Sequence, residues 1–93
     1  MIDSFGDRET KKIWGQEVSL KLPRDIQRVA LRKLLMVDAA ETLEDLKVPP
    51  KNDLEKLGRD RKGQFSVRIN DQWRVCFHFR KGHATDVSIV DYH

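Results

Sequence analysis

Residues 63–93 read GQFSVRINDQWRVCFHFRKGHATDVSIVDYH, and this stretch decides the expected fold. Apolar and polar residues alternate through three segments, 64–69, 73–79 and 85–90. Such alternation is typical of β-strands, because successive side chains point to opposite faces. Short polar turns separate the segments, so we expect an antiparallel meander of three strands.

Two helices are expected before these strands. Asp7 suits the N-cap of a helix over 8–18, and Pro23 suits the first position of a helix that ends near Ala40. In the second helix apolar residues recur at three- and four-residue steps, which indicates a face packed on a sheet; the alternative is a groove that binds a partner. Helices followed by strands predict the α+β class, with two N-terminal helices packed on a small antiparallel sheet, in one domain over residues 1–93.

The segments around these elements are expected to be short or irregular. Residues 2–5 alternate and predict a small strand that pairs with a distant part of the sheet. Two prolines exclude a helix at 48–50, so residues 51–57 are expected to form a connector. Residues 58–63, GRDRKG, are expected to form a basic loop.

The composition argues against several classes of protein, namely those with internal disulfides, membrane-spanning helices, signal peptides or metal sites. The single cysteine, Cys76, excludes an internal disulfide and fits a reducing compartment. No apolar run approaches the roughly 20 residues of a membrane-spanning helix, and residues 1–5 lack the basic and the long apolar parts of a signal peptide. The histidines have no spacing typical of a metal site. We therefore expect a cytoplasmic protein that uses no metal or cofactor and binds no membrane.

Charge is unevenly divided along the chain. Residues 47–93 contain 10 Lys and Arg against 6 Asp and Glu, whereas residues 1–46 contain 8 against 9. This excess of positive charge favours an anionic partner, foremost a phosphate backbone, although a solvated basic surface is the alternative. The same two alternatives apply to the densest part of the basic half, a candidate collar for nucleic acid. We define this basic collar as Lys56, Arg59, Arg61 and Lys62.

Two arginines flank the first turn of the meander. Arg68 and Arg74 are expected to be cross-strand neighbours, and like charges at such positions repel unless an anion joins them. A phosphate fits that place, because guanidinium offers a planar pair of donors. The alternative is that each arginine pairs with a local carboxylate, such as Asp71 or Asp86.

The triplet Asp91-Tyr92-His93 offers a carboxylate, a phenol and an imidazole. RNA carries its own nucleophile, the 2′-hydroxyl, so cleavage requires only a base, an acid and cations for the charged phosphorane. An aromatic ring also stacks on an unstacked base, and imidazole exchanges protons near neutral pH. From spacing alone, the triplet is either such a site together with Arg74 or a frayed tail.

Longer motifs resemble a known family. They are LEKL at 54–57, DRxG at 60–63, SVRIN at 66–70, WRV at 73–75 and VDYH at 90–93. Together with MIxSF at 1–5 and LxxPPxNxL at 46–54, they resemble the HigB-type toxins of the RelE/ParE superfamily, near its GraT/HigB branch.

The resemblance implies a RelE/ParE-like toxin, a ribosome-dependent endoribonuclease that cuts messenger RNA and inhibits translation. It implies a HigA-type antitoxin with a helix-turn-helix. The toxin would contact operator DNA only indirectly, through this antitoxin. It assigns catalysis to Asp91, Tyr92, His93 and Arg74, with Arg74 on the phosphate. The basic residues expected to contact RNA are Lys56, Arg59, Arg61 and Arg68.

The sequence departs from the family pattern at two positions. Some members carry a histidine and a lysine ahead of DRxG, where this chain has Glu55 and Gly58. Lys56, Arg59 or Arg61 are candidates to replace these basic groups. The departure keeps two other functions open: an inhibitor that binds the ribosome or gyrase without cleavage, and a degenerate toxin that retains only antitoxin binding.

Overall fold

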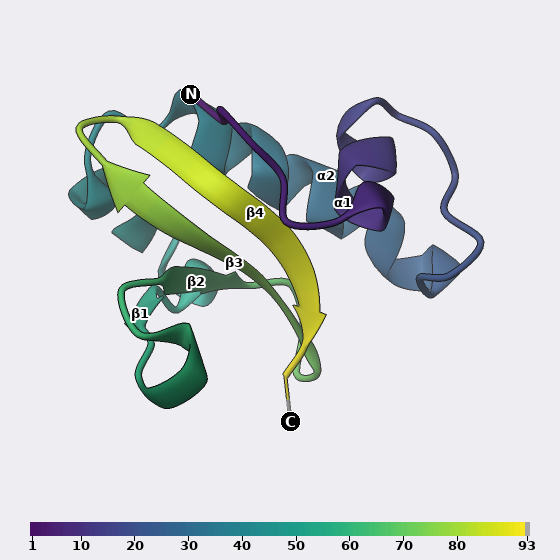
Figure 1. Cartoon of the computed structure of the whole chain (residues 1–93). Helices are drawn as coiled ribbons and strands as arrows, with labels where there is room; N and C mark the ends of the chain where they lie inside the picture. The colour runs from purple at the N-terminus through teal and green to yellow at the C-terminus, as the bar shows by residue number, and fades with distance from the viewer. Residues whose placement is uncertain (93) are drawn as a thin grey trace.

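The computed structural model describes residues 1–92, which form two α-helices and a four-stranded antiparallel sheet with the order β1-β2-β3-β4 (Figure 1). The expected α+β class, with two helices packed on an antiparallel sheet, is therefore confirmed. Short 3-10 helices lie in the connections: η1 (Leu43–Lys47), η2 (Pro50–Asn52) and η3 (Arg59–Arg61). The main elements are α1 (Arg8–Trp14), α2 (Arg24–Ala39), β1 (Glu55–Lys56), β2 (Phe65–Arg68), β3 (Trp73–Arg80) and β4 (His83–Asp91).

Helix α1 begins at Arg8, directly after the predicted cap residue Asp7, and ends before its predicted C-terminus. The Asp7 carboxylate accepts a hydrogen bond of 2.7 Å from the backbone N–H of Thr10. The helix ends at Trp14, because Gly15 caps it and Gln16 has a left-handed backbone with φ of 61°. The predicted helix over 8–18 is therefore about one turn too long.

Helix α2 contributes its apolar stripe to the core. The helix begins at Arg24, and Pro23 is its extended cap residue rather than its first helical residue. Ala30, Leu34 and Val37 are fully buried, so the stripe is core and not a groove for a partner.

The three predicted strands form the centre of the sheet. Strands β3 and β4 pair from Trp73↔Asp91 to Arg80↔His83, with an irregularity between Cys76 and His78. Both strands extend beyond their predicted bounds, because pairing continues through the residues that lead into the turn.

Two further segments join the sheet. Strand β1 pairs with β2, although residues 51–57 were expected to form only a connector. Its two residues are both exposed, so no alternation marks them in the sequence. At the other edge, Ile2 and Phe5 form isolated parallel bridges with β4, which confirms that the N-terminal segment lies against a distant part of the sheet.

The sheet has two different faces. The helix-covered face contributes Val67, Val75 and Phe77 to the core, and all three are fully buried. Paired residues in register share a face, so the opposite face carries the pairs Arg68↔Arg74 and Ser66↔Cys76. We call it the open face because neither α-helix covers it, although Ser66 and Cys76 at its centre are fully buried. None of the helices within residues 1–92 has the length and hydropathy that crossing a membrane requires.

Candidate functional site

The end of β4 is fixed beside the turn between β2 and β3 (Figure 1). Asp91 pairs in register with Trp73, and the backbone N–H of Tyr92 donates to the carbonyl of Gln72 at 2.6 Å. The Gln72 amide also donates to the Asp91 carboxylate at 3.0 Å. Asp91 and Tyr92 are therefore held by the sheet and are not frayed, whereas His93 lies outside the described residues.

An open hollow of about 370 Å³ lies at this end of the sheet. It is lined by Arg61, Val90, Asp91 and Tyr92. Arg61 comes from η3, and its guanidinium donates to the amide oxygen of Gln64 at 3.2 Å. The fold thus brings one arginine of the basic collar next to Asp91 and Tyr92, two residues of the sequence-predicted triplet.

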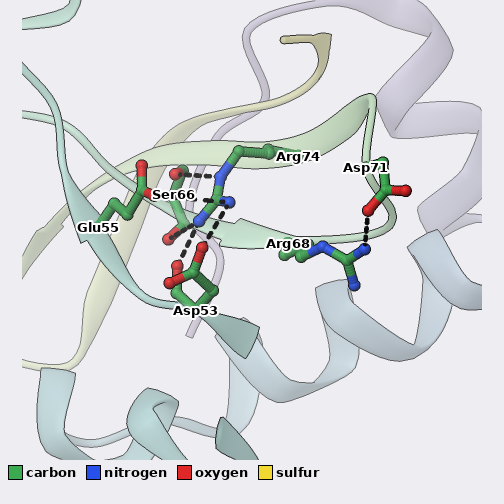
Figure 2. Close-up of polar contacts among 6 residues, drawn as sticks. All are labelled: Asp53, Glu55, Ser66, Arg68, Asp71 and Arg74. Atoms are coloured by element: carbon green, nitrogen blue, oxygen red, sulfur yellow. Dashed lines mark hydrogen bonds and ion pairs between the residues drawn. The ribbon is translucent and has the colours of Figure 1, made fainter. Parts of the chain in front are cut away.

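Arg74 pairs in register with Val90 and shares its face of the sheet, whereas Asp91 pairs with Trp73 and projects to the opposite face. The Arg74 side chain is only 8% exposed. Figure 2 shows the guanidinium between β1, β2 and the end of η2. Nε donates a hydrogen bond to the Ser66 hydroxyl at 2.7 Å. Nη1 donates to the Asp53 carboxylate at 3.3 Å and lies 3.9 Å from the Glu55 carboxylate. Nη2 donates to the backbone carbonyl of Asp53. Arg74 is therefore a buried cation held by protein groups on several sides.

Asp53 holds Arg74 through two of its own oxygens because of its backbone. It follows η2 with φ of 45° and ψ of 57°, a left-handed conformation that aspartate tolerates better than most residues. This conformation ends η2 and lets both the carbonyl and the carboxylate accept from one guanidinium.

Arg68 is a cross-strand neighbour of Arg74, as predicted, yet the two side chains have separate partners. The Arg68 guanidinium forms an ion pair with Asp71 of the adjoining turn (Figure 2). The two facing arginines thus pair with two separate carboxylates: Arg68 with Asp71 of the adjoining turn, as the local alternative expected, and Arg74 with the distant Asp53.

The rest of the basic collar is exposed. Lys56 lies on β1, Arg59 on η3, and Lys62 directly after η3. Within residues 1–92, none of these three side chains has a carboxylate within 4.0 Å. Their charges are therefore available to an external anion, in contrast to those of Arg68 and Arg74.

Other reactive groups on these strands give no additional chemistry. Burial raises the pKa of the Cys76 thiol, so the thiol is protonated and inert at neutral pH. Among residues 1–92 there is no cluster of three or more His, Cys, Asp or Glu side chains arranged to hold a metal ion.

Sequence reasoning missed the residues that hold Arg74. Asp53 and Ser66 carry no motif of their own, and Glu55 was noted only as a departure from a family pattern. The one available signal is the burial of an arginine in an alternating strand, since a buried guanidinium requires a partner.

Comparisons with known proteins identify the family of this chain. Residues 3–93 match the model of the HigB-like toxin family, described as a RelE-like toxin of the type II toxin–antitoxin system HigB. Toxin HigB-1 of Vibrio cholerae is 40% identical over 81 residues, which cover 86% of this chain and 85% of that protein. Endoribonuclease HigB of Proteus vulgaris is 31% identical over 94 residues, covering all of both chains.

The fold also has a solved counterpart. The structure of a YoeB–YefM complex from Staphylococcus aureus aligns with a TM-score of 0.60 at 18% identity, covering 100% of this chain and 98% of the other. This likeness concerns the fold, whereas the family match covers nearly the whole sequence. The chain belongs to the HigB-like family of RelE-like toxins of type II toxin–antitoxin systems.

Proposed function

We propose that this protein is a ribosome-dependent endoribonuclease that cuts messenger RNA and thereby inhibits translation. One observation carries the proposal: Arg61, Asp91 and Tyr92 line one open hollow at the end of β4, beside Val90, which pairs in register with Arg74. A cation, a carboxylate and an aromatic phenol are the groups expected for metal-free cleavage beside a 2′-hydroxyl.

Each residue has a role that suits its position. His93 exchanges a proton with the 2′-hydroxyl or with the leaving 5′-oxygen, and Asp91 orients a basic group or accepts that proton. Tyr92, 40% exposed, stacks on or orients the nucleotide. Arg61 contacts the phosphate at the rim of the hollow.

Arg74 acts from beneath the surface in this scheme. Its guanidinium is already hydrogen-bonded to Ser66 and Asp53, so little of it is available for direct contact. The Asp53 and Glu55 carboxylates offset part of its charge, as Asp71 does for Arg68. We therefore assign Arg74 chiefly to fixing the floor of the site, where its remaining positive field favours the scissile phosphate.

The exposed collar residues provide the remaining RNA contacts. Lys56 and Arg59 have no carboxylate partner within residues 1–92, so they replace the basic groups that Glu55 and Gly58 remove. Arg68 contributes more weakly, because Asp71 already neutralises its charge.

Cleavage by purified protein tests the proposal. Ribosomes programmed with message are incubated with the wild type and with His93→Gln, and RNA 5′ ends are mapped. We expect new ends with the wild type and a rate at least about 100-fold lower with His93→Gln, which is the usual contribution of a general acid or base. Equal cleavage by both proteins would exclude the role of His93, and equal cleavage without ribosomes would exclude ribosome dependence.

A non-cleaving inhibitor is the second candidate, and one observation favours it. Glu55 lies 3.9 Å from Arg74, where some family members have a basic residue, and so lowers the positive charge near the site. Such a protein stops translation or acts on gyrase but leaves transcripts intact after expression. Normal growth without antitoxin would instead indicate a degenerate toxin.

The proposed antitoxin is a HigA-type protein with a helix-turn-helix that binds the toxin and, in the complex, the operator DNA. The proposed setting is the cytoplasm, where ribosomes and message are found. Co-expression with the protein encoded next to the toxin should restore growth, and the toxin alone should give no shift of operator DNA.

A further inference from the structure

A second and larger hollow, of about 570 Å³, lies at the other end of the open face, at the β3–β4 turn. The register pairs Arg80 with His83 and His78 with Thr85. Paired residues project from the same face, so these four side chains form one wall of the hollow. Lys81, at the turn itself, adds a second full positive charge.

The cations of this hollow lack the partners that the other strand arginines have. Arg68 and Arg74 each have a carboxylate within 4.0 Å, whereas Arg80 and Lys81 have none within residues 1–92. Both side chains are exposed and adjacent in sequence, so they repel each other unless an external anion lies between them. A phosphate group provides that anion and suits a guanidinium and an ammonium equally well.

The two histidines provide flat rings beside these charges. The His78 ring is held by the Gly63 carbonyl at 3.2 Å, and the His83 ring is held by the Asp3 carboxylate at 2.9 Å. Both side chains remain about half exposed, at 42% and 52%. The other ring nitrogen of His78 lies 3.9 Å from the Asp86 carboxylate. Rings that are held through their nitrogens and remain about half exposed suit stacking by an unpaired nucleic-acid base.

The second hollow is close to the first in sequence, because Arg61 lines the first and Gly63 lines the second. Arg80 lies six residues beyond Arg74 along β3, which corresponds to about 20 Å at the rise of a strand. A single strand of RNA of several nucleotides is long enough to reach both hollows.

We propose that this second hollow is a binding subsite for single-stranded RNA, distant from the bond that is cut. Arg80 and Lys81 bind a backbone phosphate, and His78 or His83 stacks on a base. The inference rests on the proposed endoribonuclease function, because it assigns the subsite to the same RNA-binding face. Message and ribosomal RNA share this chemistry, so the experiment separates the two sources.

Binding is best measured in the His93→Gln background, where the RNA is expected to stay intact. Fluorescence anisotropy compares a labelled trinucleotide with a single-stranded RNA of about 12 nucleotides, a length typical of single-strand sites. The test variant is Arg80→Gln/Lys81→Gln. The matched control is Arg24→Gln/Arg28→Gln, which removes two exposed charges on α2 without a carboxylate partner in residues 1–92.

We expect the test variant to bind the longer RNA at least about 10-fold more weakly at low salt and to bind the trinucleotide unchanged. The slope of log K against log salt should fall by about 0.7, since the two side chains bind one phosphate and each phosphate contact to a single strand contributes about 0.7. The control should change neither quantity by as much. Thermal unfolding of both variants verifies that they remain folded.

Co-sedimentation with ribosomes completes the test. Weaker ribosome binding with unchanged binding of the longer RNA assigns the subsite to ribosomal RNA, and the reverse assigns it to message. Unchanged binding in both assays overturns the inference, as does an equal loss in the control. Absence of cleavage by the protein with native His93, combined with length-dependent RNA binding, would refute the proposed nuclease and leave the subsite intact.

Discussion

The two faces of the sheet are stabilised in different ways. The helix-covered face buries Val67, Val75 and Phe77 in a dry apolar core with α2. The open face buries Arg74 and Ser66, and it does so through hydrogen bonds and an ion pair that reach Asp53, 21 residues away in sequence. The first face needs only apolar residues of suitable size, whereas the second needs specific partners from distant segments. Substitutions on the two faces should therefore lower the free energy of unfolding by different amounts and for different reasons.

The largest loss of stability is expected on the helix-covered face. Phe77 is fully buried, and Phe77→Ala should lower the free energy of unfolding by about 3–5 kcal/mol, since it removes contacts and leaves a cavity. Denaturant unfolding measures the change. Leu20→Ala is the control, because Leu20 is 92% exposed and its loss should cost under about 0.5 kcal/mol. Similar effects of both substitutions would contradict the assigned core.

A smaller loss is expected on the open face. Arg74→Leu removes the donor to the buried Ser66 hydroxyl and should cost about 2 kcal/mol, within the range for a buried group left unpaired. The cost stays moderate because the Asp53 carboxylate, 57% exposed, regains water. Arg74→Lys keeps the charge but loses the fork of donors, so it should recover only part of the stability. Full recovery by lysine would show that charge alone matters at this position.

This difference also explains which features were predictable. Local periodicity marked β2, β3, β4 and α2, since each buries one apolar face and repeats its pattern every two or three to four residues. The same periodicity placed Arg68 opposite Arg74, and register confirms it. Asp91 and Tyr92 beside Arg61 were expected only as separate motifs, because a loop and a strand end meet through the fold.

Other features depend on single backbone conformations that no periodicity reports. The early end of α1 depends on the left-handed Gln16, and the partner of Arg74 depends on the left-handed Asp53. Strand β1 is two exposed residues that pair because β2 offers an edge. Each arises from a long-range contact or a single turn, and such features need the assembled chain to be recognised.

Lys33 combines features of both faces, because it is a charged residue that α2 buries in the apolar core region. Its side chain donates to the Asn52 amide oxygen at 2.6 Å, and the residue is 5% exposed. Burial, and next the charges of Arg32, Arg68 and Lys51, lower the pKa of Lys33 below its ordinary value of 10.5.

The sign of the pH dependence follows from this lowered pKa. Between the folded pKa and 10.5 the unfolded chain binds more protons at Lys33, so the free energy of unfolding rises with pH through that window. Below the folded pKa the penalty of the buried charge is present in full. Lys33→Met should remove this rise and change stability at neutral pH by only about 1 kcal/mol, because relief of the charge offsets the donor that Asn52 loses. Unfolding of both proteins from neutral to alkaline pH measures it, and equal slopes would contradict the assignment.

The smallest effect on stability should come from the rim of the open face. Arg61 has one side-chain hydrogen bond, of 3.2 Å to Gln64, and Arg61→Gln should lower the free energy of unfolding by less than about 0.5 kcal/mol. If Arg61 contacts the phosphate at the first hollow, the same substitution should slow message cleavage on ribosomes by about 10-fold or more, the size of one charge-assisted hydrogen bond. Arg24→Gln, on exposed α2 surface, serves as the control and should change neither quantity. A loss of stability comparable to that of Arg74→Leu would mean that Arg61 is a structural residue like Arg74, and cleavage at the wild-type rate would remove Arg61 from the site. A small loss of stability together with a large loss of cleavage is the pattern expected of a residue whose charge serves the substrate more than the fold.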